Sequence, residues 1–76
     1  MEELMEILEN LRPDVDFEKE TALVTGGILE SFDIVALVGE LDEAFDIEIK
    51  PNHLIPENFN SVNAIWALVE KLRDEW

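Results

Sequence analysis

Cysteine is absent from this chain of 76 residues, and basic residues are scarce. Without cysteine, neither a disulfide nor a thiolate metal site can stabilise the fold. Five Lys and Arg stand against 19 Asp and Glu, giving a formal net charge of −14. Such a charge repels nucleic-acid phosphates and anionic membrane surfaces, and it attracts basic patches on proteins. We therefore expect a protein that binds other proteins and no nucleic acid.

Long apolar runs are also missing. No run approaches the ~20 residues needed to span a bilayer, so we expect no membrane insertion. The first residues are acidic and lack the basic and apolar regions of a signal peptide. The sequence therefore predicts a cytoplasmic protein. Its hydrophobic content of 47% argues against disorder despite the charge, and its length predicts a single domain over residues 1–76, expected to be a monomer.

Apolar residues recur at helical spacing in three segments. The first covers Leu4 to Leu11 and ends before Pro13, because the residue before a proline is disfavoured in a helix. The second covers Ser31 to Phe45, and the third follows Asn60 or Ser61, either of which is a suitable cap.

Two shorter patterns complete the expected architecture. Pro56–Phe59 has the sequence of one helical turn that begins with proline. Ile47-Glu48-Ile49 alternates like a strand but has no partner strand. The sequence thus predicts an all-α fold, a small four-helix bundle with three longer helices and one short helix.

The second predicted helix has a buried face and an acidic face. Ser31 is its expected N-cap, at the positive end of the helix dipole. Gly39 lies inside it, at a cost of about 1 kcal/mol relative to Ala, and indicates either close helix packing or a flat spot for a partner. The predicted core stripe consists of Ile34, Val38, Leu41 and Phe45, broadened by Val35 and Leu37.

Residues 13–30 form an unusually long loop for so small a domain, and such loops are often functional. We expect its scattered apolar residues to pin it across the core. Gly26-Gly27 permits a sharp turn with positive φ. The loop delivers the chain to Ser31, whose hydroxyl is expected to be exposed, preceded by Glu30, and available as an attachment point.

Enzymatic and metal-binding constellations are lacking. No nucleophile–base pair is evident, so we predict that the chain is not an enzyme. His53 has no second His or Cys to complete a metal site, which favours a loop or packing role. Asp14, Asp16 and Glu18 resemble half of a calcium loop but lack its Gly and bidentate Glu, so no metal site is predicted. Of the two tryptophans, Trp66 is expected to pack in or beside the core, and Trp76 is expected to fray at the end of the chain.

These features together resemble the acyl and peptidyl carrier proteins over essentially the whole chain. The segment Gly27-Ile28-Leu29-Glu30-Ser31-Phe32 is similar to the Gly-x-x-Asp-Ser-Leu motif that opens the family's second helix. The acidic stretch from Leu37 to Ile49 and the segment Pro56–Val62 match the rest of the pattern in order and spacing. The resemblance is greatest to free-standing carriers, such as D-alanyl carriers and dedicated biosynthetic carriers.

The resemblance implies that Ser31 carries 4′-phosphopantetheine, a covalent cofactor derived from coenzyme A, on which acyl or aminoacyl cargo is held as a thioester. It implies three kinds of partner: a phosphopantetheinyl transferase, a loading ligase, and downstream transferases with basic patches. Two positions depart from the family pattern. Glu30 replaces the usual aspartate, which keeps the charge but adds a methylene, and Phe32 replaces leucine or methionine.

Partner docking is expected on the acidic face of the second helix, because long-range attraction to basic patches raises association rates. A different class of function remains open, namely an unmodified acidic adaptor that binds a basic partner. Intact mass after treatment with a transferase and coenzyme A separates the two. The predicted docking residues are Glu30, Phe32, Ala36, Gly39, Glu40 and Glu43.

Overall fold

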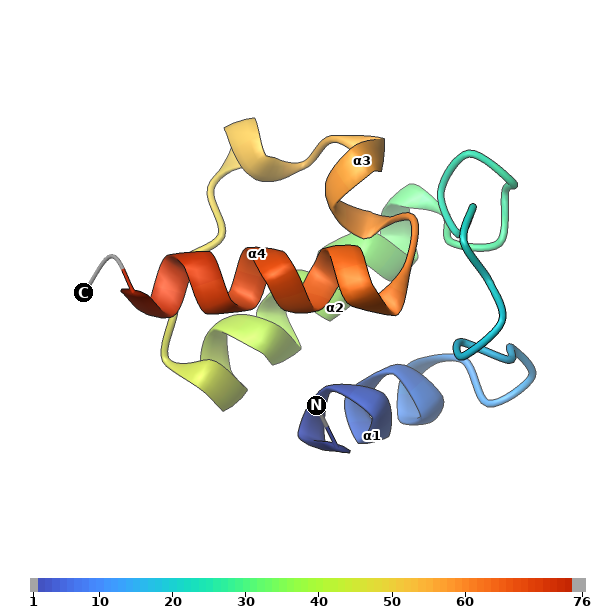
Figure 1. Cartoon of the computed structure of the whole chain (residues 1–76), viewed down its shortest axis with the longest axis horizontal. Coiled ribbons are helices and arrows are strands. Elements are labelled where there is room, and N and C mark those ends of the chain that lie inside the picture. Colours follow the sequence, from blue (N-terminus) through green and yellow to red (C-terminus); the bar gives the residue numbers. More distant parts are fainter. Residues whose placement is uncertain (1, 75–76) are drawn as a thin grey trace.

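The computed structural model describes residues 2–74, which form helices and loops without a strand. Three longer helices and one short helix appear, as predicted, together with one short 3₁₀ turn, and none of the described helices is long and apolar enough to cross a membrane. Trp76, predicted to fray, lies outside the described residues. The elements in Figure 1 are α1 (Glu2–Leu11), α2 (Ser31–Phe45), η1 (Pro51–His53), α3 (Pro56–Phe59) and α4 (Val62–Asp74).

The helix ends follow local sequence signals. α1 ends at Leu11, two residues before Pro13, and α3 begins at Pro56, whose fixed φ suits the first helical position. α4 is capped by Ser61, whose Oγ accepts a hydrogen bond from the Ala64 N–H at 3.1 Å. Of the two predicted caps for α4, Ser61 is thus the one used.

A single apolar core lies between the helices. α1 packs on α2, α3 packs on α4, and α4 crosses α2 (Figure 1). The burial of these leucine, isoleucine and valine side chains is the main source of stability, at roughly 1.5–3 kcal/mol for each fully buried side chain. The fully buried helical residues are Leu4, Leu8, Leu37, Leu41, Phe59, Ile65 and Val69.

The predicted core stripe of α2 is partly wrong. Leu37 and Leu41 are completely buried, whereas Val35, which was expected to broaden the stripe, is 68% exposed. Val35 precedes Leu37 by two residues, which is about 200° around a helix with 3.6 residues per turn. The two side chains therefore cannot share a face of α2, and it is Leu37 that is buried in the core. Ile34, Val38 and Phe45 are half-buried beside it.

The long loop is held against the core, as predicted. Phe17, Leu23 and Leu29 are buried, and the Leu29 N–H donates to the Leu23 carbonyl at 2.7 Å. Gly27 has a φ of +78°, a conformation that side chains disfavour. The loop consequently arrives at α2 along a defined path.

Asn60 ties this loop to the segment before α4. Its Oδ1 accepts hydrogen bonds from the N–H groups of Val24 and Thr25, both at 3.0 Å, and its carbonyl accepts one from Leu23 at 2.8 Å. Asn60 is thus a tether between distant segments, whereas the sequence suggested it only as a possible cap.

The alternation at Ile47-Glu48-Ile49 reflects burial without a sheet. Ile47 and Ile49 are buried and Glu48 is exposed. Asp42 supports this extended exit from α2, since its Oδ1 accepts the Ile49 N–H at 2.9 Å. Trp66 has the predicted packing role, with its ring edge-to-face against Phe45 at 5.7 Å between centroids.

Candidate functional site

Ser31 is the first residue of α2 and is exposed to solvent. The helix has the predicted range, but Ser31 is its first helical residue and not the N-cap that the sequence predicted. Glu30 takes the N-cap position with extended backbone, and its carbonyl accepts the Ile34 N–H at 3.0 Å. The Glu30 N–H donates to Asp33 Oδ2 at 3.2 Å, which stabilises this cap. The Ser31 hydroxyl is therefore not required as a cap.

The backbone at Ser31 suits a negatively charged group. The first turn of α2 leaves N–H groups without partners within the helix, and the helix dipole adds positive potential at the same end. Both effects favour an anion such as a phosphate at a helix start. The residues at this position consequently fit a phosphate ester on the serine oxygen.

Arg12 supports this helix start from the far side of the loop. Its Nη1 donates to the Ile28 carbonyl at 2.9 Å and to Asp33 Oδ2 at 3.0 Å. Its Nε and Nη2 donate to the two oxygens of Asp14, each at 3.2 Å. The contacts to Asp14 raise the pKa of Arg12, with a smaller contribution from Asp33, and the hydrogen bond from Arg12 lowers the pKa of Asp14. The sequence did not predict this bridge between the end of α1 and the start of α2.

An apolar hollow of about 240 Å³ adjoins Ser31. It lies between the start of α2 and the segment that includes α3, and the sequence did not predict it. The segments that form it are distant in the sequence, and only the fold brings them together. Its lining consists of Val24, Ser31, Ile34, Val35, Leu54, Ile55, Pro56 and Phe59.

Three large apolar side chains that line this hollow are exposed, as is Phe32, which follows Ser31 in the sequence and is not among the lining residues. Phe32 is 82% exposed, Val35 68%, Ile55 44% and Leu54 43%. Of these, the sequence identified only Phe32 as a surface residue. A helical wheel centred on Leu37 would have placed Val35 outside, but Leu54 and Ile55 carry no comparable periodic signal.

The predicted docking residues lie together on α2 and at its cap. Phe32, Ala36, Gly39 and Glu43 recur at the spacing of one helical face, and Glu40 lies beside them. Ala36 is half-buried and the others, including Glu30, are exposed. Acidic and apolar groups therefore share one surface next to Ser31.

Gly39 does not serve close packing. A Cβ atom built at this position would meet no neighbouring atom within 4 Å. Of the two interpretations of this glycine, close helix packing is therefore excluded among the described residues. A flat, exposed point on the helix remains.

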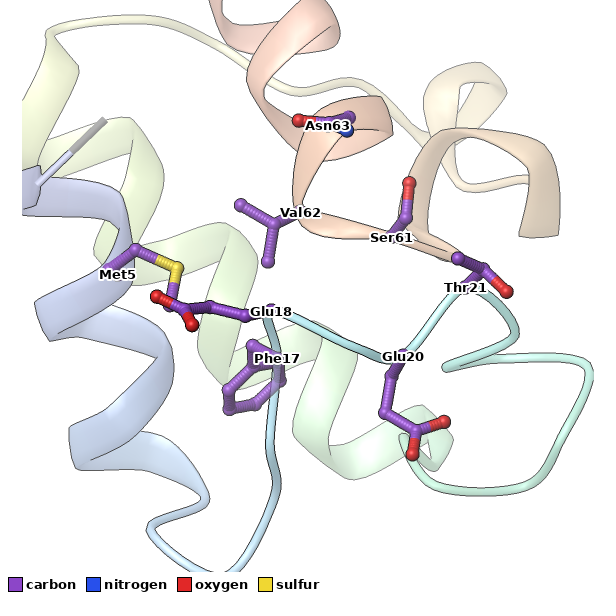
Figure 2. Close-up of a pocket in the computed structure, with 8 residues that line it drawn as sticks. All are labelled: Met5, Phe17, Glu18, Glu20, Thr21, Ser61, Val62 and Asn63. Atoms are coloured by element: carbon purple, nitrogen blue, oxygen red, sulfur yellow. The ribbon is translucent and has the colours of Figure 1, made fainter.

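A second hollow, of about 290 Å³, lies between α1, the loop and the start of α4 (Figure 2). Met5, Phe17, Glu18 and Glu20 are among the residues that line it. It contains neither Ser31 nor any predicted docking residue. Ser31 and this hollow are thus separate.

Two of the residues considered as metal ligands, Asp14 and His53, have other roles. Asp14 pairs with Arg12, and His53 Nδ1 accepts the Lys50 N–H at 3.1 Å within the η1 turn. The loop role predicted for His53 is confirmed. Within residues 2–74, no group of three or more His, Cys, Asp or Glu side chains is arranged to hold a metal ion.

Curated relatives share nearly the whole length of this chain. It is 33% identical over 76 residues to the D-alanyl carrier protein of Lactococcus lactis subsp. lactis (strain IL1403), covering 97% of this chain and 96% of that protein. The D-alanyl carrier protein of Streptococcus sanguinis (strain SK36) is 33% identical over 73 residues, covering 95% and 92% respectively.

No family model matches the chain. The relatives are named as carriers, which agrees with the prediction that this protein is not an enzyme. Their full-length similarity and the helical bundle described above confirm the predicted resemblance. The chain therefore belongs to the family of free-standing carrier proteins that includes the D-alanyl carriers.

Proposed function

We propose that this carrier bears 4′-phosphopantetheine on Ser31 and holds its cargo there as a thioester. The observation that carries the proposal is an exposed serine hydroxyl at the first position of a 15-residue helix, beside an apolar hollow. When bound, the group would supply a terminal thiol that the protein, which has no cysteine, does not possess.

The chain's own contribution is to present one hydroxyl to a transferase. The Ser31 oxygen would form a bond to the phosphate that bears pantetheine in coenzyme A. The bond between that phosphate and the adenosine-bearing phosphate would break, adenosine bisphosphate would leave with its electron pair, and a base of the transferase would take the hydroxyl proton. A base is not needed on the carrier itself.

Residues near Ser31 fit the attached group. The free N–H groups of the first turn of α2 would hold the phosphate. The apolar parts of the arm would find Val35, Leu54 and Ile55 at the rim of the adjoining hollow. Attachment at this point raises the local concentration of cargo at each partner's active site.

The partners would be a phosphopantetheinyl transferase, a loading ligase and downstream transferases with basic docking patches. The exposed side chains of Phe32, Glu40 and Glu43 support a docking face on α2 that combines an apolar centre with negative charge. The name of the relatives favours a D-alanyl group as cargo. A cytoplasmic location, expected from the sequence, stays a prediction.

The decisive experiment compares the two serines of the chain, Ser31 and Ser61. Each single alanine variant is incubated with a broad-specificity transferase and coenzyme A, and its intact mass is measured. Ser31→Ala should take up no mass, and its free energy of unfolding should change by no more than about 0.5 kcal/mol, because Ser31 is exposed and is not the cap.

Ser61→Ala is the matched control. It should still gain the mass of one arm, although loss of the α4 cap destabilises it by about 1 kcal/mol. Modification of the Ser31→Ala variant would contradict the proposed site. A wild-type chain that gains no mass under any transferase would favour the acidic adaptor instead.

A further inference from the structure

A single nitrogen atom of Arg12 contacts both sides of the segment that contains Ser31. Nη1 donates to the Ile28 carbonyl at 2.9 Å and to Asp33 Oδ2 at 3.0 Å. The two acceptors flank residues 29–32. The Arg12 N–H in turn donates to the Leu8 carbonyl at 2.9 Å, which fixes Arg12 to the end of α1. The end of one helix thus holds the start of another.

Asp33 extends this network to the residue before Ser31. The same oxygen, Oδ2, accepts the Glu30 N–H at 3.2 Å. Arg12 therefore orients the carboxylate that completes the cap of α2. The guanidinium is planar and carries several donors in a fixed arrangement, so one side chain can serve Ile28, Asp33 and Asp14 at once.

The two carboxylates that contact Arg12 differ in environment. The Asp33 side chain is 17% exposed, whereas that of Asp14 is 67% exposed. Water and salt screen the Asp14 pair more strongly. Asp14 also lies only two residues from Arg12, so its contact joins no distant segments. The contact to Asp33 links positions 21 apart in the sequence.

We infer that Arg12 is a positioning residue for the modification of Ser31, acting through Ile28 and Asp33 to hold residues 28–33 in the conformation that the transferase receives. This inference rests on the proposed function. Loss of Arg12 would leave the docking residues Glu40 and Glu43 in place but would loosen the backbone that carries the reacting hydroxyl. The effect should consequently fall on the transfer step more than on association.

The first measurement is amide hydrogen exchange of the unmodified protein. Arg12→Gln keeps a polar side chain but removes the charge and the planar array of donors. Exchange of the Leu29 and Glu30 amides, which donate to the Leu23 carbonyl and to Asp33 Oδ2, should accelerate roughly threefold or more. Asp14→Asn is the matched control, and it should leave exchange in this segment unchanged.

The second measurement is the rate of modification at a temperature where circular dichroism shows each variant folded. Arg12→Gln should lower the kcat of the transferase with the carrier as substrate roughly three- to tenfold, as expected for loss of a part-buried contact. The KM of the transferase for the carrier should change less. Arg12→Lys should recover only part of the rate, because a single ammonium cannot reproduce the fork. Asp14→Asn should be modified at the wild-type rate.

A double-mutant cycle tests whether Arg12 acts through Asp33. The Arg12→Gln, Asp33→Asn variant should be no slower than the slower of the two single variants. Multiplicative losses in the cycle, a wild-type kcat for folded Arg12→Gln, or an equal loss in Asp14→Asn would overturn the inference. These results differ from failure of the proposed function, in which the wild-type chain itself gains no mass.

Discussion

Two adjacent polar residues before α4, Asn60 and Ser61, have different structural roles. Ser61 caps the helix, and Asn60 accepts two backbone hydrogen bonds from the loop. The Val24 N–H is in a part-buried position, where a donor without a partner is costly. The short amide side chain of Asn60 thereby fixes a loop segment that lies 35 positions before it in the sequence, at Thr25.

Asn60→Ala should therefore destabilise the protein by about 1–2 kcal/mol, because the amides of Val24 and Thr25 lose their acceptor. Urea denaturation followed by circular dichroism measures the change. Asn63→Ala is the matched control, since Asn63 is exposed on α4 and its replacement should stay within about 0.5 kcal/mol. Equal stability of the two variants would show that the tether contributes nothing.

Helix α2 has two faces with different tasks. Leu37 and Leu41 are completely buried in the core, whereas Glu40 and Glu43 are exposed. The exposure of both glutamates agrees with the sequence prediction. Because the two faces are separate, charge on the outer face can change without disturbing the packing of the inner one.

Replacing Glu40 and Glu43 with lysine should slow modification by the transferase, most visibly at low salt, because like charges would meet at a basic partner patch. The fold should be retained, with each exposed substitution within about ±0.5 kcal/mol. Rates of modification over a series of salt concentrations provide the measurement.

The control for this variant places the same substitutions on α1. Glu6 and Glu9 are exposed and have the same three-residue spacing. Glu6→Lys, Glu9→Lys alters net charge equally, so any difference between the two double variants reports the location of the charge. Equal modification rates for the two double variants would show that the acidic face of α2 has no docking role.

The molecule as a whole carries a formal net charge of −14 on 76 residues. Self-repulsion of this kind opposes the compact state. Two of the described ion pairs, Arg12 with Asp14 and Lys19 with Asp16, lie at the surface and offset little of it, which leaves the part-buried pair of Arg12 with Asp33.

Added sodium chloride or millimolar magnesium should raise the melting temperature by screening or neutralising the acids. A salt titration followed by thermal melts measures this effect. Glu6→Lys, Glu9→Lys, which carries less negative charge, should show a shallower rise than the wild type. A melting temperature that is flat or falls with salt would contradict the role given to repulsion.

The sequence by itself determined the helical architecture. Local signals were sufficient: Pro13 and Pro56 mark helix boundaries, Ser61 caps α4 as one of two candidates, and Gly27 adopts the expected positive φ. The order of motifs around Ser31 also indicated the carrier family, because those motifs are short stretches of chain. Attachment at Ser31 stays a proposal.

Only the tertiary structure decided what surrounds Ser31. Arg12 meets Asp33 across 21 positions, and the adjoining hollow combines α2 with Leu54 and Ile55. The exposure of Val35 likewise follows from tertiary packing, because the core buries Leu37 and Val35 lies on the other side of α2. Helical periodicity describes one segment at a time, whereas these contacts depend on how segments pack against each other. Physically, capping and proline effects act within a few residues, but burial and long-range ion pairs exist only once the chain has closed its loops.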